Sequence, residues 1–213
     1  MDSPDMGLRE LKKLMTRETI ADAALKLALE HGMDNLTIDE IARMAFVSPR
    51  TFSNYFASKE EAVVAADAPR WAGFVDGAVQ RPTDEPPLEV LRQAVVGSTK
   101  AWSLEQVRSF VRHLELDEQF VSLRPYRLAQ YDALEADLRA VIADRTGADP
   151  DADAYPGLVS AAAVATIRST IGLWMRSGSA ARRLPAMLDE AFAQLASGLT
   201  GSNHHRRSRR RGA

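Results

Sequence analysis

The chain contains no cysteine among its 213 residues. Disulfide bonds, a thiolate nucleophile and a zinc site built on cysteine are therefore excluded. The sequence also has no uninterrupted apolar run of about 18 residues, the length that a membrane-spanning helix needs. The N-terminal MDSPDMGLRELKK lacks the apolar segment of a secretory signal. These absences favour a cytoplasmic protein with no membrane partner.

The motifs of the common catalytic sites are missing too. There is no G-x-S-x-G nucleophile elbow, no glycine-rich phosphate loop and no H-E-x-x-H zinc motif. His204 and His205 precede a run of arginines, which is more typical of a basic tail than of a metal site. The acidic segment TGADPDADAYPG lacks the glycine and the distal glutamate of a calcium loop. We therefore predict no enzyme activity, no metal and no cofactor.

Strand-like alternation of apolar and polar residues is absent, whereas a helical repeat runs through most of the chain. Pro69 falls inside a helix expected from residue 58 towards 79 and should kink or divide it. The segment RPTDEPP is a linker by composition. The sequence thus predicts an all-α fold, with helices expected at 16–32, 88–102, 107–114, 126–146, 156–178 and 183–199.

The stretch from Thr37 to Lys59, TIDEIARMAFVSPRTFSNYFASK, predicts two short helices joined by a tight turn. Thr37 and Glu40 have the spacing of a capping box, which satisfies free amides at a helix start. Ser48 is a fresh N-cap, and Pro49 follows it at the first helical position, where its missing N–H costs nothing. The pattern indicates a helix-turn-helix, whose second helix can enter a DNA major groove.

The second of these helices has two contrasting faces. Phe52 and Phe56 lie four residues apart and should face the core, while the residues between them are polar. Arginine pairs with guanine edges, asparagine with adenine edges, and hydroxyl or ammonium groups with phosphates. Spacing alone fits a DNA-reading pair and a pair of amphipathic core helices about equally well.

The segment LTIDEIARMAFVSPRTFSNYFASKEEAV, preceded by RETIADAALKLALEHG, resembles the N-terminal domain of the TetR (tetracycline-repressor) family. The resemblance covers about residues 16–64, with TIDEIA, VSPRTF and Y-F-x-S-K-E in the family order. It implies an N-terminal helix-turn-helix DNA-binding domain at 1–65, including an arm at 1–15. A helical effector-binding and dimerisation domain would follow at 66–200, and a basic tail at 201–213.

The resemblance also implies a function: a transcriptional regulator, in particular a repressor released from operator DNA by a small molecule. Base contacts are expected from Arg50 first and Asn54 second. Phosphate contacts are expected from Thr37, Ser48, Thr51, Ser53, Tyr55 and Lys59. An activator, or a helical interaction module with weakened or no ligand control, is the alternative.

A homodimer is implied through helices 156–178 and 183–199, unless these faces pack only within one subunit. A hydrophobic effector is expected among the helices between about 88 and 176. Arg112 could meet an anionic group there. The tentative effector-binding set is aromatic and apolar with one further arginine: Trp102, Phe110, His113, Leu114, Tyr126, Tyr131, Arg168, Trp174 and Met175.

Three segments leave alternatives open. Lys12 and Lys13 either touch DNA or belong to a frayed terminus. The five arginines of the tail either add DNA affinity or keep the end solvated. Family members often carry glycine at the turn where this chain has Phe46. A bulky residue at positive φ is strained, so either the turn adopts another conformation or Phe46 packs against the neighbouring helix.

Overall fold

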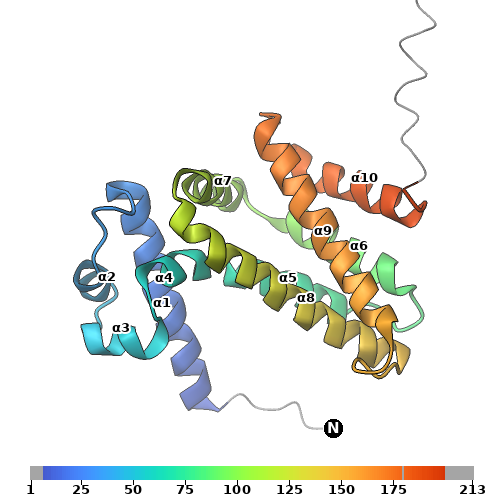
Figure 1. Cartoon of the computed structure of the whole chain (residues 1–213), viewed down its shortest axis with the longest axis horizontal. Coiled ribbons are helices and arrows are strands. Elements are labelled where there is room, and N and C mark those ends of the chain that lie inside the picture. The colour runs from blue at the N-terminus through green and yellow to red at the C-terminus, as the bar shows by residue number, and fades with distance from the viewer. Residues whose placement is uncertain (1–6, 179, 200–213) are drawn as a thin grey trace, which may run out of the picture. The chain divides into compact units, whose positions relative to one another are not determined.

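The computed structural model describes residues 7–178 and 180–199, and every regular element within these ranges is helical. The all-α prediction is therefore confirmed. The basic tail at 201–213 lies outside the described residues. Figure 1 labels the ten α-helices of the described part: α1 (Leu8–His31), α2 (Ile38–Met44), α3 (Pro49–Tyr55), α4 (Lys59–Ala65), α5 (Ala68–Val79), α6 (Pro87–Ala101), α7 (Leu104–Gln119), α8 (Arg124–Thr146), α9 (Ala154–Arg176) and α10 (Leu184–Ala196). Single 3₁₀ turns, η1 (Val121–Leu123) and η2 (Ala181–Arg183), precede α8 and α10.

The chain forms two compact units that interleave along the sequence. Unit 1 comprises Met1–Trp71 and Glu105–Asp132, and unit 2 comprises Ala72–Leu104 and Ala133–Ala213. Helices α5 and α8 consequently pass from one unit into the other. The expected division near residue 65 does not describe these units, because most of α7 and the start of α8 belong with the N-terminal helices.

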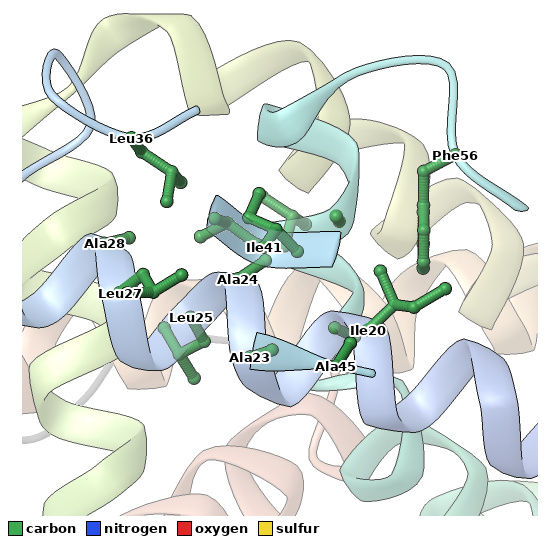
Figure 2. Packing of buried hydrophobic residues seen from close by; sticks show 14 of the residues in the cluster. Ile20, Ala23, Ala24, Leu25, Leu27, Ala28, Leu36, Ile41, Ala45 and Phe56 are labelled. Carbon is green, nitrogen blue, oxygen red and sulfur yellow. The ribbon is translucent and has the colours of Figure 1, made fainter. Parts of the chain in front are cut away.

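Unit 1 is built on α1, which packs against α4 and α2, while α2 packs against α3. Its core is made of small and branched side chains, and Figure 2 shows Ala24 of α1 beside Ile41 of α2, with Ile20 further along α1 on the side of Phe56. Phe52 and Phe56 are both buried, with ring centroids 5.8 Å apart, as their four-residue spacing predicted. The short helices α2 and α3 therefore hold their positions through packing on α1 and α4.

Helix α1 begins eight residues earlier than expected. It starts at Leu8, so residues 8–15 are helical and the predicted arm at 1–15 is wrong for this part. Thr16, the first residue of the expected helix, lies inside α1, and its hydroxyl donates to the carbonyl of Lys12 at 2.8 Å. Lys12 and Lys13 are exposed on this added part of α1.

The break between α4 and α5 confirms the effect predicted for Pro69. Helix α4 ends at Ala65, and α5 starts at Ala68 with Pro69 as its second residue. Proline is tolerated there because a first-turn amide has no partner within its own helix. The break leaves Asp67 between the two helices, fully buried.

In unit 2, α10 packs against α9 and α6, and α6 also contacts α9. Leu184, Leu188 and Phe192 form the buried face of α10, spaced four residues apart. At the edge of this packing Arg92 of α6 forms an ion pair with Asp189 of α10, at 2.9 Å. Unit 2 thus has its own apolar core with a partly exposed ion pair at its border.

Candidate nucleic-acid interface

Side-chain caps fix the starts of the short helices α2, α3 and α4. Thr37 and Glu40 form the predicted capping box: the Thr37 hydroxyl accepts from the Glu40 amide and the Glu40 carboxylate accepts from the Thr37 amide. Ser48 accepts from the amide of Thr51 at 2.9 Å, and Ser58 from the amide of Glu61 at 3.1 Å. Because each cap joins a residue to the amide three positions later, the local spacing sufficed to predict the caps at Thr37 and Ser48.

The turn between α2 and α3 is a Schellman motif. The amide of Val47 donates to the carbonyl of Ala42 at 2.9 Å, and the amide of Phe46 donates to the carbonyl of Arg43 at 3.3 Å. This motif places the residue after the helix C-cap in the left-handed region, which is why glycine usually occupies it. Phe46 accordingly has φ of 56°.

Both structural expectations for Phe46 are wrong. The turn keeps the left-handed conformation, and the side chain is 95 % exposed, so it does not pack against a neighbouring helix. The next residue, Val47, packs against the core of unit 1. The side chain of Phe46 consequently points outward. Left-handed backbone costs a residue with a Cβ on the order of 1–2 kcal/mol. Phe46 bears this strain without burying its ring.

Helix α3 presents the polar face that the sequence predicted. Arg50, Ser53 and Asn54 are exposed, and within the described part of the chain the side chains of Arg50 and Asn54 form no hydrogen bond or ion pair. Ser48 and Thr51 share a hydroxyl–hydroxyl hydrogen bond of 2.8 Å at the helix start, and Ser53 donates to the carbonyl of Pro49. The two residues favoured for base contacts are thus free to meet a partner.

Tyr55 departs from the expected outward position. It is only half exposed and packs against the core of unit 1. Its backbone carbonyl accepts a hydrogen bond of 2.7 Å from the guanidinium of Arg17 on α1. The same guanidinium lies 4.2 Å from the centre of the Phe56 ring. Arg17, which sequence analysis missed, therefore attaches the end of α3 to α1.

Lys59 has a structural role within unit 1, which sequence analysis missed. Its ammonium group donates to the carbonyl of Met33 at 2.7 Å and to the carbonyl of Leu36 at 2.9 Å. These bonds hold the loop between α1 and α2 against the start of α4. Two of the three ammonium donors are consequently used inside unit 1.

We expect Lys59→Met to destabilise the fold without changing the number of DNA phosphates that the protein neutralises. Loss of two charge-assisted hydrogen bonds should lower the free energy of unfolding by about 1–3 kcal/mol. Urea unfolding measures that loss, and a salt titration measures the number of phosphates neutralised. A salt slope reduced by about one in Lys59→Met would instead restore the phosphate assignment.

A buried charged network lies where α4 meets α5. Asp67 Oδ2 is 2.8 Å from Nδ1 of His113 on α7 and 2.9 Å from a guanidinium nitrogen of Arg127 on α8. Arg127 also pairs with Asp117 at 2.6 Å and meets Nε2 of His113 at 3.2 Å. Arg70 forms a further ion pair with Asp67.

The pKa values of the two buried carboxylates, Asp67 and Asp117, shift in opposite directions. Burial alone would raise the pKa of Asp67, but His113, Arg127 and Arg70 outweigh it and lower this pKa to about 2. Burial raises the pKa of Asp117 in spite of the adjacent Arg127. Burial lowers the pKa of Arg127, but the two carboxylates more than offset this effect and raise it. Asp67 is therefore the ionised centre of the network.

Gln130 extends this network to the backbone of α4. Its amide nitrogen donates to the carbonyl of Val64 at 2.7 Å, while its amide oxygen accepts from Arg127 and from the indole of Trp71. The Trp71 ring in turn packs edge-on against Phe110 and Tyr131. Helices α4, α7 and α8 are thereby tied together at the base of the helix-turn-helix.

The tentative effector set is not brought together within one unit. Phe110, His113, Leu114, Tyr126 and Tyr131 lie in unit 1, and Trp102, Arg168, Trp174 and Met175 lie in unit 2. His113 belongs to the charged network, and the Tyr126 hydroxyl accepts from Ser58 at 2.9 Å. Trp102 stacks on Phe74, and the Trp174 indole donates to the carbonyl of Ala180. Arg168 is exposed on α9.

Unit 1 has two neighbouring surface hollows between α1 and α7, each of about 450 Å³. Arg112 and Leu29 line both of them, and Leu116 with Phe120 adds an apolar wall to one. None of the nine tentative effector residues lines either hollow. Arg112, which the sequence analysis names as a contact for an anionic group, lies at both hollows.

Capped short helices, a tight turn and an exposed polar second helix together define a DNA-binding protein of the helix-turn-helix class. Residues 20–66 match the family model described as bacterial regulatory proteins of the tetR family, and residues 85–200 match that of the MftR C-terminal domain. The chain belongs to the TetR family and is a DNA-binding transcriptional regulator.

Two curated relatives cover nearly the whole chain. The HTH-type transcriptional regulator TcmR of Streptomyces glaucescens is 31 % identical over 197 residues, which are 89 % of this chain and 86 % of TcmR. The putative mycofactocin biosynthesis transcriptional regulator MftR of Mycobacterium tuberculosis is 25 % identical over 193 residues, covering 90 % and 95 %. TetR-family regulators bind operator DNA and small-molecule effectors, and they typically dimerise.

Solved structures agree with the fold. FadR of Bacillus subtilis, in complex with stearoyl-CoA, has a TM-score of 0.54 at 18 % identity and covers 84 % of this chain and 97 % of its own. FadR of Bacillus halodurans has a TM-score of 0.52 at 18 % identity and covers 88 % and 97 %. At such identities the similarity establishes the arrangement of helices.

Proposed function

We propose that the chain acts in the cytoplasm as a homodimeric repressor, which binds a roughly palindromic operator through α3 and leaves it when a small, largely apolar effector binds. The single observation that carries this proposal is the exposed polar face of α3 on a capped and packed scaffold. Arg50 is assigned to base edges, Asn54 to a second base, and Thr37, Ser48, Thr51 and Ser53 to phosphates.

The dimer is proposed to form through α9 and α10. Helix α9 is long and apolar enough to span a membrane by composition, with a mean hydropathy of 1.4, yet only 39 % of its most apolar window is buried in one chain. Leu158, Ala165, Ser169 and Leu173 are exposed and fall within about a quarter of a turn of one another around the helix. A second copy would cover this face, and the two-fold axis would place two α3 helices about 34–36 Å apart.

We propose that the buried charged network transmits effector binding to α3 and so releases the protein from its operator. Gln130 and Arg127 on α8, and His113 on α7, hold the end of α4 and Asp67. A ligand that displaces α7 or α8 would therefore displace α4 and, with it, α3. Only an effector with a higher affinity for the displaced state can weaken operator binding.

We expect Arg50→Ala to weaken binding to the operator by about 1–3 kcal/mol and to relax base preference. The measurement is a salt titration of binding to the DNA that flanks the protein's own gene, with a random duplex of equal length beside it. Loss restricted to the flanking DNA supports a base contact. Equal loss on both duplexes would reduce Arg50 to a phosphate contact.

Arg43 provides a matched control, because it is an exposed arginine on the preceding helix α2. Arg43→Ala removes the same charge from unit 1 but should leave base preference unchanged. If the unmodified protein binds both duplexes weakly and equally at all salt concentrations, the proposed repressor function at this DNA is wrong.

A further inference from the structure

Phe46 is the feature of unit 1 that the proposed function leaves unexplained. It combines a left-handed backbone with an exposed aromatic ring, at the turn that leads into α3. Neither property stabilises the folded chain, since glycine would relieve the strain and a polar side chain would suit the solvent. A strained residue with no internal compensation indicates a contact outside the fold.

The position of Phe46 limits what that contact is. It lies two residues before the N-cap Ser48 and four before Arg50, and all three side chains are exposed. In helix-turn-helix proteins the N-terminal residues of the second helix approach the base edges. The turn immediately before them reaches the border of the contacted bases. The major groove offers one apolar group there, the C5-methyl of thymine, which phenylalanine contacts favourably.

We propose that Phe46 is a specificity-determining residue, whose ring packs on a thymine methyl at the edge of each half-site. This inference rests on the proposed DNA-binding role of α3. It adds a preference for thymine at a position that Arg50 and Asn54 do not read. The left-handed turn is what directs the ring outward, because Val47 occupies the inward position.

The test separates the ring from the backbone strain with two variants. Phe46→Ala removes the ring and keeps a Cβ at positive φ, whereas Phe46→Gly removes both. Affinity for the duplex flanking the gene should fall about 5- to 20-fold in both variants, as loss of one base contact implies. The midpoint of thermal unfolding should rise by about 2–4 °C in Phe46→Gly alone, because only glycine relieves the strain.

Thymine itself is tested by the DNA. Each thymine of the bound site is replaced in turn by deoxyuridine, which lacks only the methyl group. One symmetric pair of replacements should weaken the unmodified protein about 5- to 20-fold and leave Phe46→Ala unaffected. If every replacement affects the two proteins equally, no thymine methyl is read by Phe46.

Leu199, the other described non-glycine residue with positive φ, is 68 % exposed. Leu199→Gly is therefore a control for the strain alone, and it should raise the unfolding midpoint in the same way. Loss of affinity in Phe46→Gly but not in Phe46→Ala would overturn the inference in favour of turn rigidity. If the unmodified protein shows no sequence preference at all, the proposed function is wrong, and the inference about Phe46 is wrong with it.

Discussion

Replacing Arg127 by methionine is expected to lower the free energy of unfolding by about 3–5 kcal/mol. The substitution retains a long side chain but leaves Asp67 and Asp117 buried without the guanidinium that bridges them. Removing one partner of a buried ion pair leaves an uncompensated charge, which costs more than the pair itself contributes. Urea unfolding followed by circular dichroism measures the change.

The acid dependence of stability identifies the carboxylate responsible. The pKa of Asp67 falls from 3.8 to about 2 on folding, so the ionised form stabilises the fold by about 2 kcal/mol above pH 4. This stabilisation is lost progressively as the pH falls from 4 through 2, and below pH 2 Asp67 is protonated in both the folded and the unfolded state. The stability difference between the unmodified protein and Asp67→Asn should therefore be constant above pH 5 and shrink below pH 4.

The partly exposed pair of Arg92 and Asp189 is the control for burial. Asp189→Asn breaks an ion pair of similar length, yet it should cost at most about 1 kcal/mol because water screens the charges. The double variant Asp67→Asn/Arg127→Met should cost less than the sum of its two single variants. Additive losses would mean that the two side chains stabilise the fold independently.

Local chemistry explains what could be predicted from the sequence. The caps at Thr37, Ser48 and Ser58 and the helix break at Pro69 depend on neighbours within a few residues. The sequence-based start of α1 is eight residues too late because residues 8–15 (LRELKKLM) contain four charged side chains, which suggest a solvated arm. Leucine, arginine, glutamate, lysine and methionine nevertheless all favour helices.

Contacts across the chain account for the rest of the candidate site. Lys59 donates to carbonyls 23 and 26 residues earlier, and Arg127 pairs with a carboxylate 60 residues away. No short pattern predicts such partners, so the internal contacts of Lys59 and His113 could not be predicted from the sequence. The strain at Phe46 was foreseen from the turn type, but its exposure depends on the burial of Val47.

A charge placed on the exposed face of α9 is expected to have the second largest effect. Ala165 lies at the middle of this face between Leu158 and Leu173, and it is exposed in the single chain. Ala165→Glu should leave each chain folded while placing two like charges together across a two-fold axis. Operator affinity should then fall by about 100-fold or more, because one α3 helix alone reaches a single half-site.

Sedimentation velocity and operator binding on the same sample check this expectation. Ala136→Glu, at an exposed alanine of α8, adds the same charge outside the proposed dimer face and should change neither measurement. A dimer that persists in Ala165→Glu with full operator affinity would place the subunit contact elsewhere. A monomer that retains full affinity would contradict the two-half-site mechanism.

Trp71 gives the molecule an intrinsic optical probe of its own switching. Its indole is 5 % exposed and hydrogen-bonds to Gln130, the residue that joins the charged network to α4. Indole emission responds to polarity and to nearby carboxylates, so its wavelength should shift when α8 moves relative to α4. The chain has three tryptophans, and replacing Trp102 and Trp174 by phenylalanine would isolate this one. Ligand screening then needs neither an attached dye nor a known operator.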